Sequence, residues 1–488
     1  PPTVQGVLAA RIDRLPAEEK VLLQTLAVIG REFSLGLLKQ VVDQSEDTLQ
    51  GLLSHLQAAE FIYEQPAFPE VEYTFKHALT QEVAYNSLLL ERRKGLHERT
   101  AKGIEEVYRL RLEDHYGELA HHYSRSGNSK KAVEYLKLAG QQAVQRSAPA
   151  EATSHFTTAL QLLKTLPDTA ERTQQELMLQ VALGAPLQAM KGPAAPEVEH
   201  AYTRARELCR QVGETPLLFP ALRGLWVLHH VRAELETARE LGEQLLHLAE
   251  RFQDPALLLE AHRALGSTLL WLGEFALARA HLEQGSALYD PQHHGSLAFL
   301  YGGANPSISC LCDEARALWF LGYPDQALQR SHMALTLARG LSDPFSLGYA
   351  LVFAAGLHQL RREGRATQER AEAAIALANE QGFASLVSAG EIRRGWALAE
   401  QGQTEEGLRQ MRQGLAARQT TGAGLAQSYF LALQAEVYGK VGQMEQALPL
   451  LTEALAVVHK TGELRWEAEL WRIKGELMLK IDGGPTTP

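Results

Sequence analysis

The amino-acid sequence predicts an all-α protein in which helix pairs stack side by side, preceded by a small module that contains a β-hairpin. The main observation is a recurring four-position pattern. A turn glycine is followed five residues later by a small residue, nine later by a mostly apolar one, and twelve later by another small one. The copies are Gly127/Ala132/Leu136/Ala139, Gly273/Ala278/Leu282/Gly285, Gly322/Ala327/Ser331/Ala334, Gly402/Gly407/Met411/Gly414 and Gly442/Ala447/Leu451/Ala454.

This pattern predicts close helix pairs. Positions five, nine and twelve lie on one face of a helix, because an α-helix has 3.6 residues per turn. Small side chains on that face allow a second helix to approach, and the glycine closes the turn between the two helices. One helix pair cannot bury its own apolar face, but stacked pairs can, so repetition predicts an elongated helical array. Such arrays usually offer a surface to a partner rather than catalytic chemistry.

The first hundred residues differ from the rest and predict a winged-helix module. A helix is expected behind Pro16, another behind Ser45 as its N-cap, and two extended runs separated by Pro66 and Pro69. Helices should resume at about His77. The predicted elements are helix 17–29, helix 46–59, strands 61–64 and 71–75, and helices from 77 past 107 with a break near Leu90.

Beyond about Glu113 the sequence predicts helices only. Gly/Pro-rich segments at 190–196 and 289–306 predict turns between repeats, and the second holds nine residues more than the spacing of about 40 requires. The expected domains are a winged-helix module at 1–105, a helical solenoid at 106–480 and a disordered tail at 481–488. The solenoid matches the tetratricopeptide pattern in part, through Leu265-Gly266 with Ala278.

Composition excludes several classes of function. Apolar residues make up 45 % of the chain, and no apolar run approaches the roughly 18 residues that span a bilayer. A net charge of −10 opposes attachment to nucleic acid or acidic lipid. Three cysteines are too few for a disulfide framework. We expect a cytoplasmic protein without membrane or DNA partners. The chain begins Pro-Pro-Thr and not with methionine, so either processing removed a segment or the chain is a piece of a longer protein, and we expect the second.

No motif predicts a cofactor or a catalytic centre. The phosphate-binding pattern G-x-x-x-x-G-K-[ST] is absent from the sequence, and the segment Tyr438-Gly-Lys-Val is the nearest match. The pairs His121-His122, His229-His230 and His293-His294 point about 100° apart on a helix, so packed or solvated side chains are expected rather than metal ligands. We therefore expect no catalytic or metal-binding residues. An enzyme with a site at 289–306, around His293-His294, is the least favoured hypothesis.

A winged helix raises the alternative of a transcriptional regulator. DNA recognition needs arginine or lysine, yet none occurs between Lys39 and Lys76, and Glu46, Asp47 and Glu60 are acidic. The basic run 91–102 predicts a solvated helix face, with docking on an acidic domain as the other interpretation. DNA binding is therefore the alternative and not the main hypothesis.

Several segments resemble the region that follows the ATPase domain in bacterial signalling ATPases of the STAND type. They are Leu8-Ala-Ala-Arg-Ile-Asp-Arg-Leu-Pro, Leu26-Ala-Val-Ile-Gly-Arg-Glu-Phe33, Tyr73-Thr-Phe-Lys-His-Ala-Leu-Thr-Gln-Glu-Val-Ala-Tyr85 and Arg92-Arg-Lys-Gly-Leu-His97. The resemblance is closest to proteins that join a class III adenylate/guanylate cyclase domain, an AAA-like ATPase and a tetratricopeptide-like tail. It implies that ATP or ADP with Mg is bound by an upstream domain that lies outside this chain.

The same resemblance implies a role for His77. In related ATPases a winged-helix histidine contacts the ADP phosphates, and His77 in Phe75-Lys-His77 is the matching position, although Phe-Lys-His replaces the better-known Met-His-Asp. A histidine that caps or packs its own helix is the other interpretation. The expected function is a non-catalytic sensor that binds a partner or ligand, with an unknown protein or peptide as the expected partner, in the superhelix groove and controls an upstream nucleotide switch.

Overall fold

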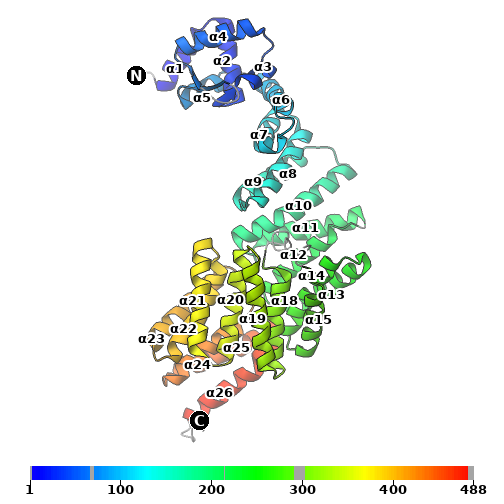
Figure 1. Cartoon of the computed structure of the whole chain (residues 1–488), viewed down its shortest axis with the longest axis vertical. Helices are drawn as coiled ribbons and strands as arrows, with labels where there is room; N and C mark the ends of the chain where they lie inside the picture. Colours follow the sequence, from blue (N-terminus) through cyan, green and yellow to red (C-terminus); the bar gives the residue numbers. More distant parts are fainter. Residues whose placement is uncertain (1–2, 66–70, 214, 291–302, 482–488) are drawn as a thin grey trace. The chain divides into compact units, whose positions relative to one another are not determined.

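The computed structural model describes residues 3–65, 71–213, 215–290 and 303–481 (Figure 1). The chain separates into two compact units, Pro1–Leu179 and Gln180–Pro488, which we call unit 1 and unit 2. Both are mostly helical. Of the predicted segments, the loop residues 291–302 and the tail residues 482–488 lie outside the described residues.

Unit 1 begins with six helices and three short strands. Ser45 caps α4 as predicted, since its Oγ accepts a hydrogen bond from the Thr48 N–H at 3.4 Å. The elements are α1 (Val4–Asp13), α2 (Ala17–Ile29), β1 (Glu32–Ser34), α3 (Leu35–Val41), α4 (Glu46–Ala58), β2 (Ile62–Gln65), β3 (Glu72–Phe75), α5 (Ala78–Asn86) and α6 (Leu90–Val107).

The strands form a three-stranded antiparallel sheet in the order β1-β3-β2. The predicted hairpin is β2 and β3, with Ile62 opposite Phe75. Strand β1 was not predicted from the sequence; it pairs Phe33 with Tyr73, whose rings stack with their centroids 6.1 Å apart. Three residues are too few to show the alternation of apolar and polar residues that predicts a strand. Strand β1 therefore depends on its pairing with β3.

The rest of unit 1 is helical. A 3₁₀ turn, η1 (Leu112–His115), leads into α7 (Tyr116–Ser126), α8 (Ser129–Gln145) and α9 (Pro149–Leu163), and α10 (Ala170–Lys191) crosses into unit 2. The predicted break at 190–196 separates α10 from the next helix, α11 (Pro196–Val212).

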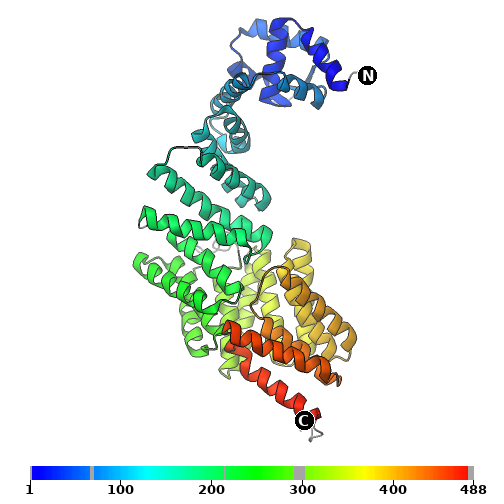
Figure 2. The ribbon, with the colours of Figure 1, turned by 180° about the vertical axis from the view of Figure 1, so that it is seen from behind.

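Unit 2 consists of successive helix pairs (Figures 1 and 2). Its elements are α11 (Pro196–Val212), α12 (Leu218–Val231), α13 (Leu235–Phe252), α14 (Pro255–Trp271), α15 (Phe275–Ala287), α18 (Pro306–Phe320), α19 (Pro324–Gly340), α20 (Pro344–Leu360), α21 (Gly364–Gln381), α22 (Ala384–Glu400), α23 (Thr404–Gln419), α24 (Gln427–Lys440), α25 (Met444–Thr461), η2 (Leu464–Trp466) and α26 (Glu467–Ile481).

The glycine pattern is confirmed at every copy. The five turn glycines have φ from +77° to +88°, the left-handed conformation that glycine adopts without steric cost. The small and apolar positions that follow them are buried in each helix. The repeats therefore fold as tetratricopeptide-like helix pairs.

Three further turns follow the same rule without glycine. Ser147, Ala233 and Arg362 have φ of +56°, +62° and +62°. Buried residues again lie five, nine and twelve positions later in the helices that follow. They are Ala152/Phe156/Ala159, Ala238/Gly242/Leu245 and Thr367/Ala371/Ala374. The copies after Ala233 and Arg362 were not predicted from the sequence, because no glycine marks their turns.

Unit 2 closes on itself. The first helices of its pairs, α12, α14, α18, α20, α22 and α24, contact one another in succession. The backbone N–H groups of Gly424 and Leu425, just before α24, donate to the Val231 carbonyl at the end of α12, at 2.9 and 3.0 Å. In addition η2 contacts α14. Segments about 190 residues apart are therefore in contact. The helices that they connect surround an interior, and the first helices of the pairs contribute side chains to it.

Candidate functional site

The interior of unit 2 contains an unusual number of buried charges. Helix α18 is buried along its length from Pro306 to Leu318, including Asp313 and Arg316. Buried arginines and carboxylates also come from α12, α14, α22 and the segment before α26. Since burying a charge is costly unless it is paired, each buried charge needs a partner or a function.

The Glu260 carboxylate on α14 is fully paired. Arg223 on α12 donates from Nε to Glu260 Oε1 at 2.8 Å, and Arg263 donates from Nε to Oε2 at 2.7 Å. Burial alone would raise the pKa of Glu260, but the two guanidinium groups outweigh it and lower that pKa. Arg263 also lies over the Trp226 ring, 4.7 Å from its centroid. This ion cluster ties α12 to α14.

The Glu463 carboxylate holds the closing loop. Its Oε1 accepts the Ala426 backbone N–H at 2.6 Å, and its Oε2 accepts the Ser428 hydroxyl. Burial raises the pKa of Glu463 despite these bonds. The residue therefore joins the start of η2 to the start of α24.

Three arginines form what we call the inner arginine cluster: Arg316 on α18, Arg393 on α22 and Arg465 in η2. Arg316 has Asp313 as its ion-pair partner at 3.6 Å and lies 3.6 Å from the centroid of the Phe353 ring on α20. Burial raises the pKa of the Asp313 carboxyl. Arg316 also repels the two other guanidinium groups and contributes to the lowering of their pKa values.

Arg393 is 4 % exposed and lies between α20 and α24. Its Nη1 donates to the Ala389 carbonyl of its own helix at 2.7 Å, and its Nε has no hydrogen-bond partner among the described residues. Gly356 makes room for the guanidinium, since a Cβ there would lie 3.1 Å from Arg393 Nε. Burial lowers the pKa of Arg393 to about 10.

Arg465 is 7 % exposed and lies over the Trp271 ring, 3.5 Å from its centroid. Among the described residues, its Nε and Nη1 atoms have no hydrogen-bond partner. Burial, with Arg316 nearby, lowers its pKa to about 9, so the group still carries its charge at neutral pH. The described residues place no carboxylate within ion-pair distance of either Arg393 or Arg465.

His77 is exposed and occupies the N-cap position of α5 without a side-chain capping bond. Its backbone carbonyl accepts the Thr80 N–H at 3.0 Å instead. The side chain is thus open to solvent, and its contact with a nucleotide stays a prediction.

The basic run on α6 is only partly a solvated face. Arg99 donates to the Val41 carbonyl, and Arg93 lies over the Tyr85 ring, 4.8 Å from its centroid. Arg92 is exposed, and Lys94 and Lys102 pair with Glu91 and Glu98 on the same helix. Part of this run therefore holds α6 in place.

The histidine pairs that the structure describes have protein partners. His122 is buried, and its Nδ1 lies 2.9 Å from Nδ1 of His97 on α6. His121 Nδ1 lies 3.0 Å from Arg125 Nη1. His229 pairs with Glu234, and His230 stacks on Trp226 with centroids 4.9 Å apart. The pair at 293–294 lies outside the described residues.

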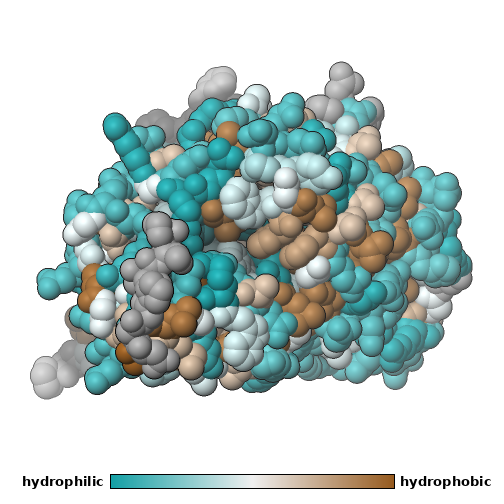
Figure 3. Space-filling model, turned by 90° about the horizontal axis from the view of Figure 1, so that it is seen from below, coloured by the Kyte–Doolittle hydropathy of each residue, from teal (hydrophilic) through white to brown (hydrophobic). Residues whose placement is uncertain are grey.

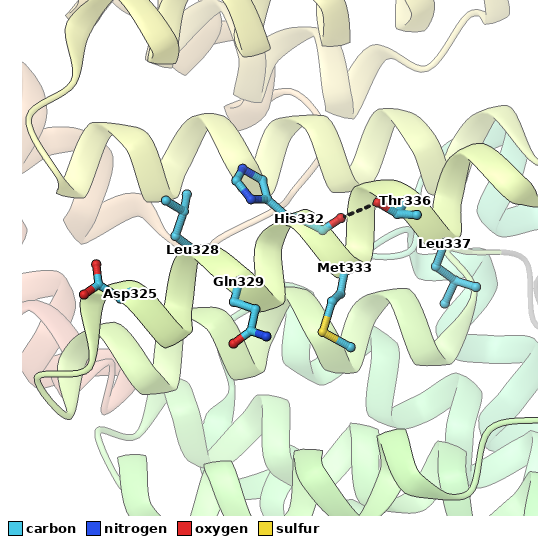
Figure 4. Close-up of a pocket in the computed structure, with 7 residues that line it drawn as sticks. All are labelled: Asp325, Leu328, Gln329, His332, Met333, Thr336 and Leu337. Atoms are coloured by element: carbon cyan, nitrogen blue, oxygen red, sulfur yellow. Dashed lines mark hydrogen bonds between the residues drawn. The ribbon is translucent and has the colours of Figure 1, made fainter.

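The surface features of the described residues are weaker candidates for a binding site than the interior of unit 2. An open depression of about 660 Å³ lies on α19 and is lined by seven residues, whose side chains Figure 4 shows: Asp325, Leu328, Gln329, His332, Met333, Thr336 and Leu337. All these residues belong to one helix. The face in Figure 3 is mostly hydrophilic with scattered apolar patches, and α26 exposes Trp471, Met478, Leu479 and Ile481. Among the described residues, no helix has both the length and the apolar character to cross a bilayer.

The fold defines the class of the chain as a tetratricopeptide-like helical solenoid with a small N-terminal three-stranded sheet among helices. No family model matches it. A curated relative, an uncharacterized protein of Rhizobium meliloti (strain 1021), is 24 % identical over 481 residues, which are 97 % of this chain and 46 % of that protein. The chain therefore spans about half the length of the curated relative that it matches.

Solved structures resemble the chain in fold. A Rap protein complexed with competence and sporulation factor has 10 % identity and a TM-score of 0.49, covering 73 % of this chain and 99 % of that one. A STAND protein with a tetratricopeptide repeat sensor from Pyrococcus horikoshii has 13 % identity and a TM-score of 0.41, covering 99 % and 65 %. NprR with its cognate peptide NprX has 13 % identity and a TM-score of 0.43, covering 65 % and 87 %.

The inner arginine cluster was not predicted from the sequence. Arg316, Arg393 and Arg465 come from segments up to 149 residues apart, and each lies in a stretch that mixes charged and apolar residues, as an ordinary amphipathic helix does. An arginine in the first helix of a pair indicates a buried site only when its place in the repeat shows that the position is buried. The repeat that starts after Arg362 was not predicted, so the predicted series of repeats was incomplete.

Proposed function

We propose that this chain is the regulatory, partner-binding part of a larger signalling protein and carries out no catalysis itself. The observation that carries the proposal is the closed array of helix pairs, whose first helices meet around an interior with polar and aromatic side chains. Repeat arrays of this kind act by binding. The bound partner or ligand would lie in the superhelix groove.

The rest of the proposed protein lies upstream. The matched relative is about twice as long as this chain, which supports the expectation of further domains. The order helix, strand, two helices, two strands in α2 to β3 supports a winged-helix module. In this proposal the module docks on an ATPase domain that binds ATP or ADP with Mg, and a nucleotide cyclase domain is one candidate output.

The proposed mechanism is a two-state switch. A partner that binds unit 2 shifts the docking equilibrium only if its affinity differs between the ADP-bound and ATP-bound states. His77 is exposed, and a neutral imidazole N–H is a suitable donor to an ADP phosphate.

Replacing His77 tests this proposal in the longer protein. A hydrogen bond to a charged group contributes about 1.5–3 kcal/mol, so His77→Ala should speed ADP release by roughly ten-fold or more. His459→Ala is the matched control, because His459 is also exposed and lies on α25. Release of fluorescent ADP measures the effect, and equal rates in all three proteins would contradict the docking.

The alternative, a DNA-binding regulator, lacks support from the described residues. Helix α4 carries no lysine or arginine, and its acidic Glu46 is paired with Lys39. A low-salt gel-shift assay should show no retardation of duplex DNA, and clear retardation would favour the alternative.

A further inference from the structure

The inner arginine cluster has more positive charge than its protein partners neutralise. Glu260 is paired with Arg223 and Arg263, and Glu463 is held by a backbone amide and a hydroxyl. Of the three clustered arginines, Arg316 is the one that lies within ion-pair distance of Asp313 among the described residues. Arg393 and Arg465 therefore remain as buried guanidinium groups without a carboxylate at ion-pair distance in the described residues.

This arrangement is costly for a protein that has nothing to bind there. The penalty for burying an ion is several kcal/mol, and leaving it unpaired adds the loss of its hydrogen bonds. Aromatic rings recover part of that cost, since Arg465 faces Trp271 and Arg393 lies 5.3 Å from the Phe430 centroid. Stacking contacts only the faces of the guanidinium planes, and at their edges Nε of Arg393 and Nε and Nη1 of Arg465 have no hydrogen-bond partner among the described residues.

The cluster is also assembled from parts that the fold brings together across unit 2. Arg316, Arg393 and Arg465 come from α18, α22 and η2, and aromatic contacts connect them. Tyr429 stacks on Trp466 with centroids 4.6 Å apart, and Phe320 contacts Trp466 edge to face at 5.6 Å. A group bound by these arginines would therefore contact the first helices and the segment that closes the array.

We propose that the inner arginine cluster is a binding site for an oxyanion, the carboxylate or phosphate group of a small ligand. Guanidinium groups present planar donors that match carboxylate and phosphate oxygens. The unpartnered Nε and Nη1 atoms of Arg465 and Nε of Arg393 supply the donors. This inference rests on the proposed binding function and names the chemistry of the ligand.

Thermal unfolding of the whole chain in defined salts tests the site. The probes are inorganic phosphate and succinate, each compared with sodium chloride at equal ionic strength, and tryptophan fluorescence follows unit 2 because all six tryptophans lie there. At least one probe should raise the midpoint by roughly 2 °C or more. Phosphate alone would indicate a phosphorylated ligand, and succinate alone a carboxylate ligand.

The variants separate binding from packing. Arg465→Met should abolish the response and, in chloride, be at least as stable as the parent chain, because it removes an unpaired buried charge. Arg465→Lys should keep a weaker response. Arg365→Met is the matched control, since its side chain is 90 % exposed, and it should respond like the parent. General salt effects act equally on all four proteins.

Two results would overturn the site. One is an anion response that is absent from the parent or equal in Arg465→Met. The other is a loss of stability of Arg465→Met in chloride that neither probe changes, which would assign the arginine to packing. Neither result bears on His77 and ADP release, so the regulatory proposal is judged separately.

Discussion

At the scale of single residues, backbone conformation decides where one helix ends and the next begins. In the eight turns that carry the repeat pattern, the turn residue lies in the left-handed region; five of these residues are glycines and three are not. An L-residue with a side chain is strained there by roughly 1–2 kcal/mol. Ser147, Ala233 and Arg362 accept this strain because the packing of the helices on either side fixes the turn.

Exchanging residues at two of these turns should change stability in opposite directions. Ser147 is exposed, so Ser147→Gly should stabilise unit 1 by about 1 kcal/mol. Gly322→Ala should destabilise unit 2 by about 1 kcal/mol, because a residue with a side chain is strained at a φ of +85°. A Cβ there meets no atom within 4 Å, so no steric clash adds to this backbone strain. Thermal unfolding followed by circular dichroism measures both changes. A destabilised Ser147→Gly variant would contradict the strain at that turn.

Buried histidines predict how unit 1 responds to acid. Burial lowers the pKa of His97 to about 4 and that of His122 to about 3, helped by the nearby charges of His121, Arg125 and, for His97, Arg93. Unfolded histidine titrates near 6.5. Between about pH 6.5 and 4 the unfolded chain therefore binds protons that the folded chain does not, so stability falls as the pH falls.

The slope of this loss is about 1.4 kcal/mol per pH unit for each histidine that stays neutral in the fold. Urea unfolding followed by circular dichroism from pH 7 to 4.5 measures it. His122→Gln should reduce the slope, and His459→Gln, at an exposed position, should leave it unchanged. An unchanged slope in His122→Gln would show that other groups are responsible.

At the scale of helices, small residues set how closely two helices pack. Gly395 on α22 and Gly407 on α23 face each other, and a Cβ on Gly407 would lie 2.4 Å from the Gly395 carbonyl oxygen. The neighbouring atom is backbone, so a methyl group there must push the two helices apart.

Gly407→Ala should therefore destabilise unit 2 by about 2–4 kcal/mol despite the better helix propensity of alanine. Gly475→Ala on α26 is the matched control, since a Cβ there meets no atom within 4 Å, and it should stabilise its helix by up to about 1 kcal/mol. Urea midpoints from tryptophan fluorescence measure both. Equal effects of the two changes would contradict close packing of α22 on α23.

Helix periodicity predicted most elements because it is a local property. The copies with glycine were found, and the 17–29 and 46–59 helices end within one residue of their predicted ends. The turns at Ala233 and Arg362 were missed because packing, and not residue type, fixes their conformation. Strand β1 and the inner arginine cluster depend on contacts between distant segments, which no local pattern encodes.

At the scale of the whole of unit 2, the closing contacts join its two ends. A Cβ on Gly424 would lie 2.7 Å from the Arg232 carbonyl oxygen, so Gly424→Val should break the contact between the α24 segment and α12. We expect hydrogen exchange to increase both near residues 424–428 and near residues 231–233. An increase confined to the site of the substitution would contradict the coupling of the two segments.

The bonds from Gly424 and Leu425 to Val231 also limit how such a chain can evolve. Repeat arrays with free ends can gain or lose a pair of helices by duplication or deletion. Here one added or deleted pair would displace these partners by roughly the 8–10 Å spacing of packed helices and leave both ends unsatisfied. The number of pairs between them is thus set by closure, and unit 2 should melt in one step instead of fraying from its termini.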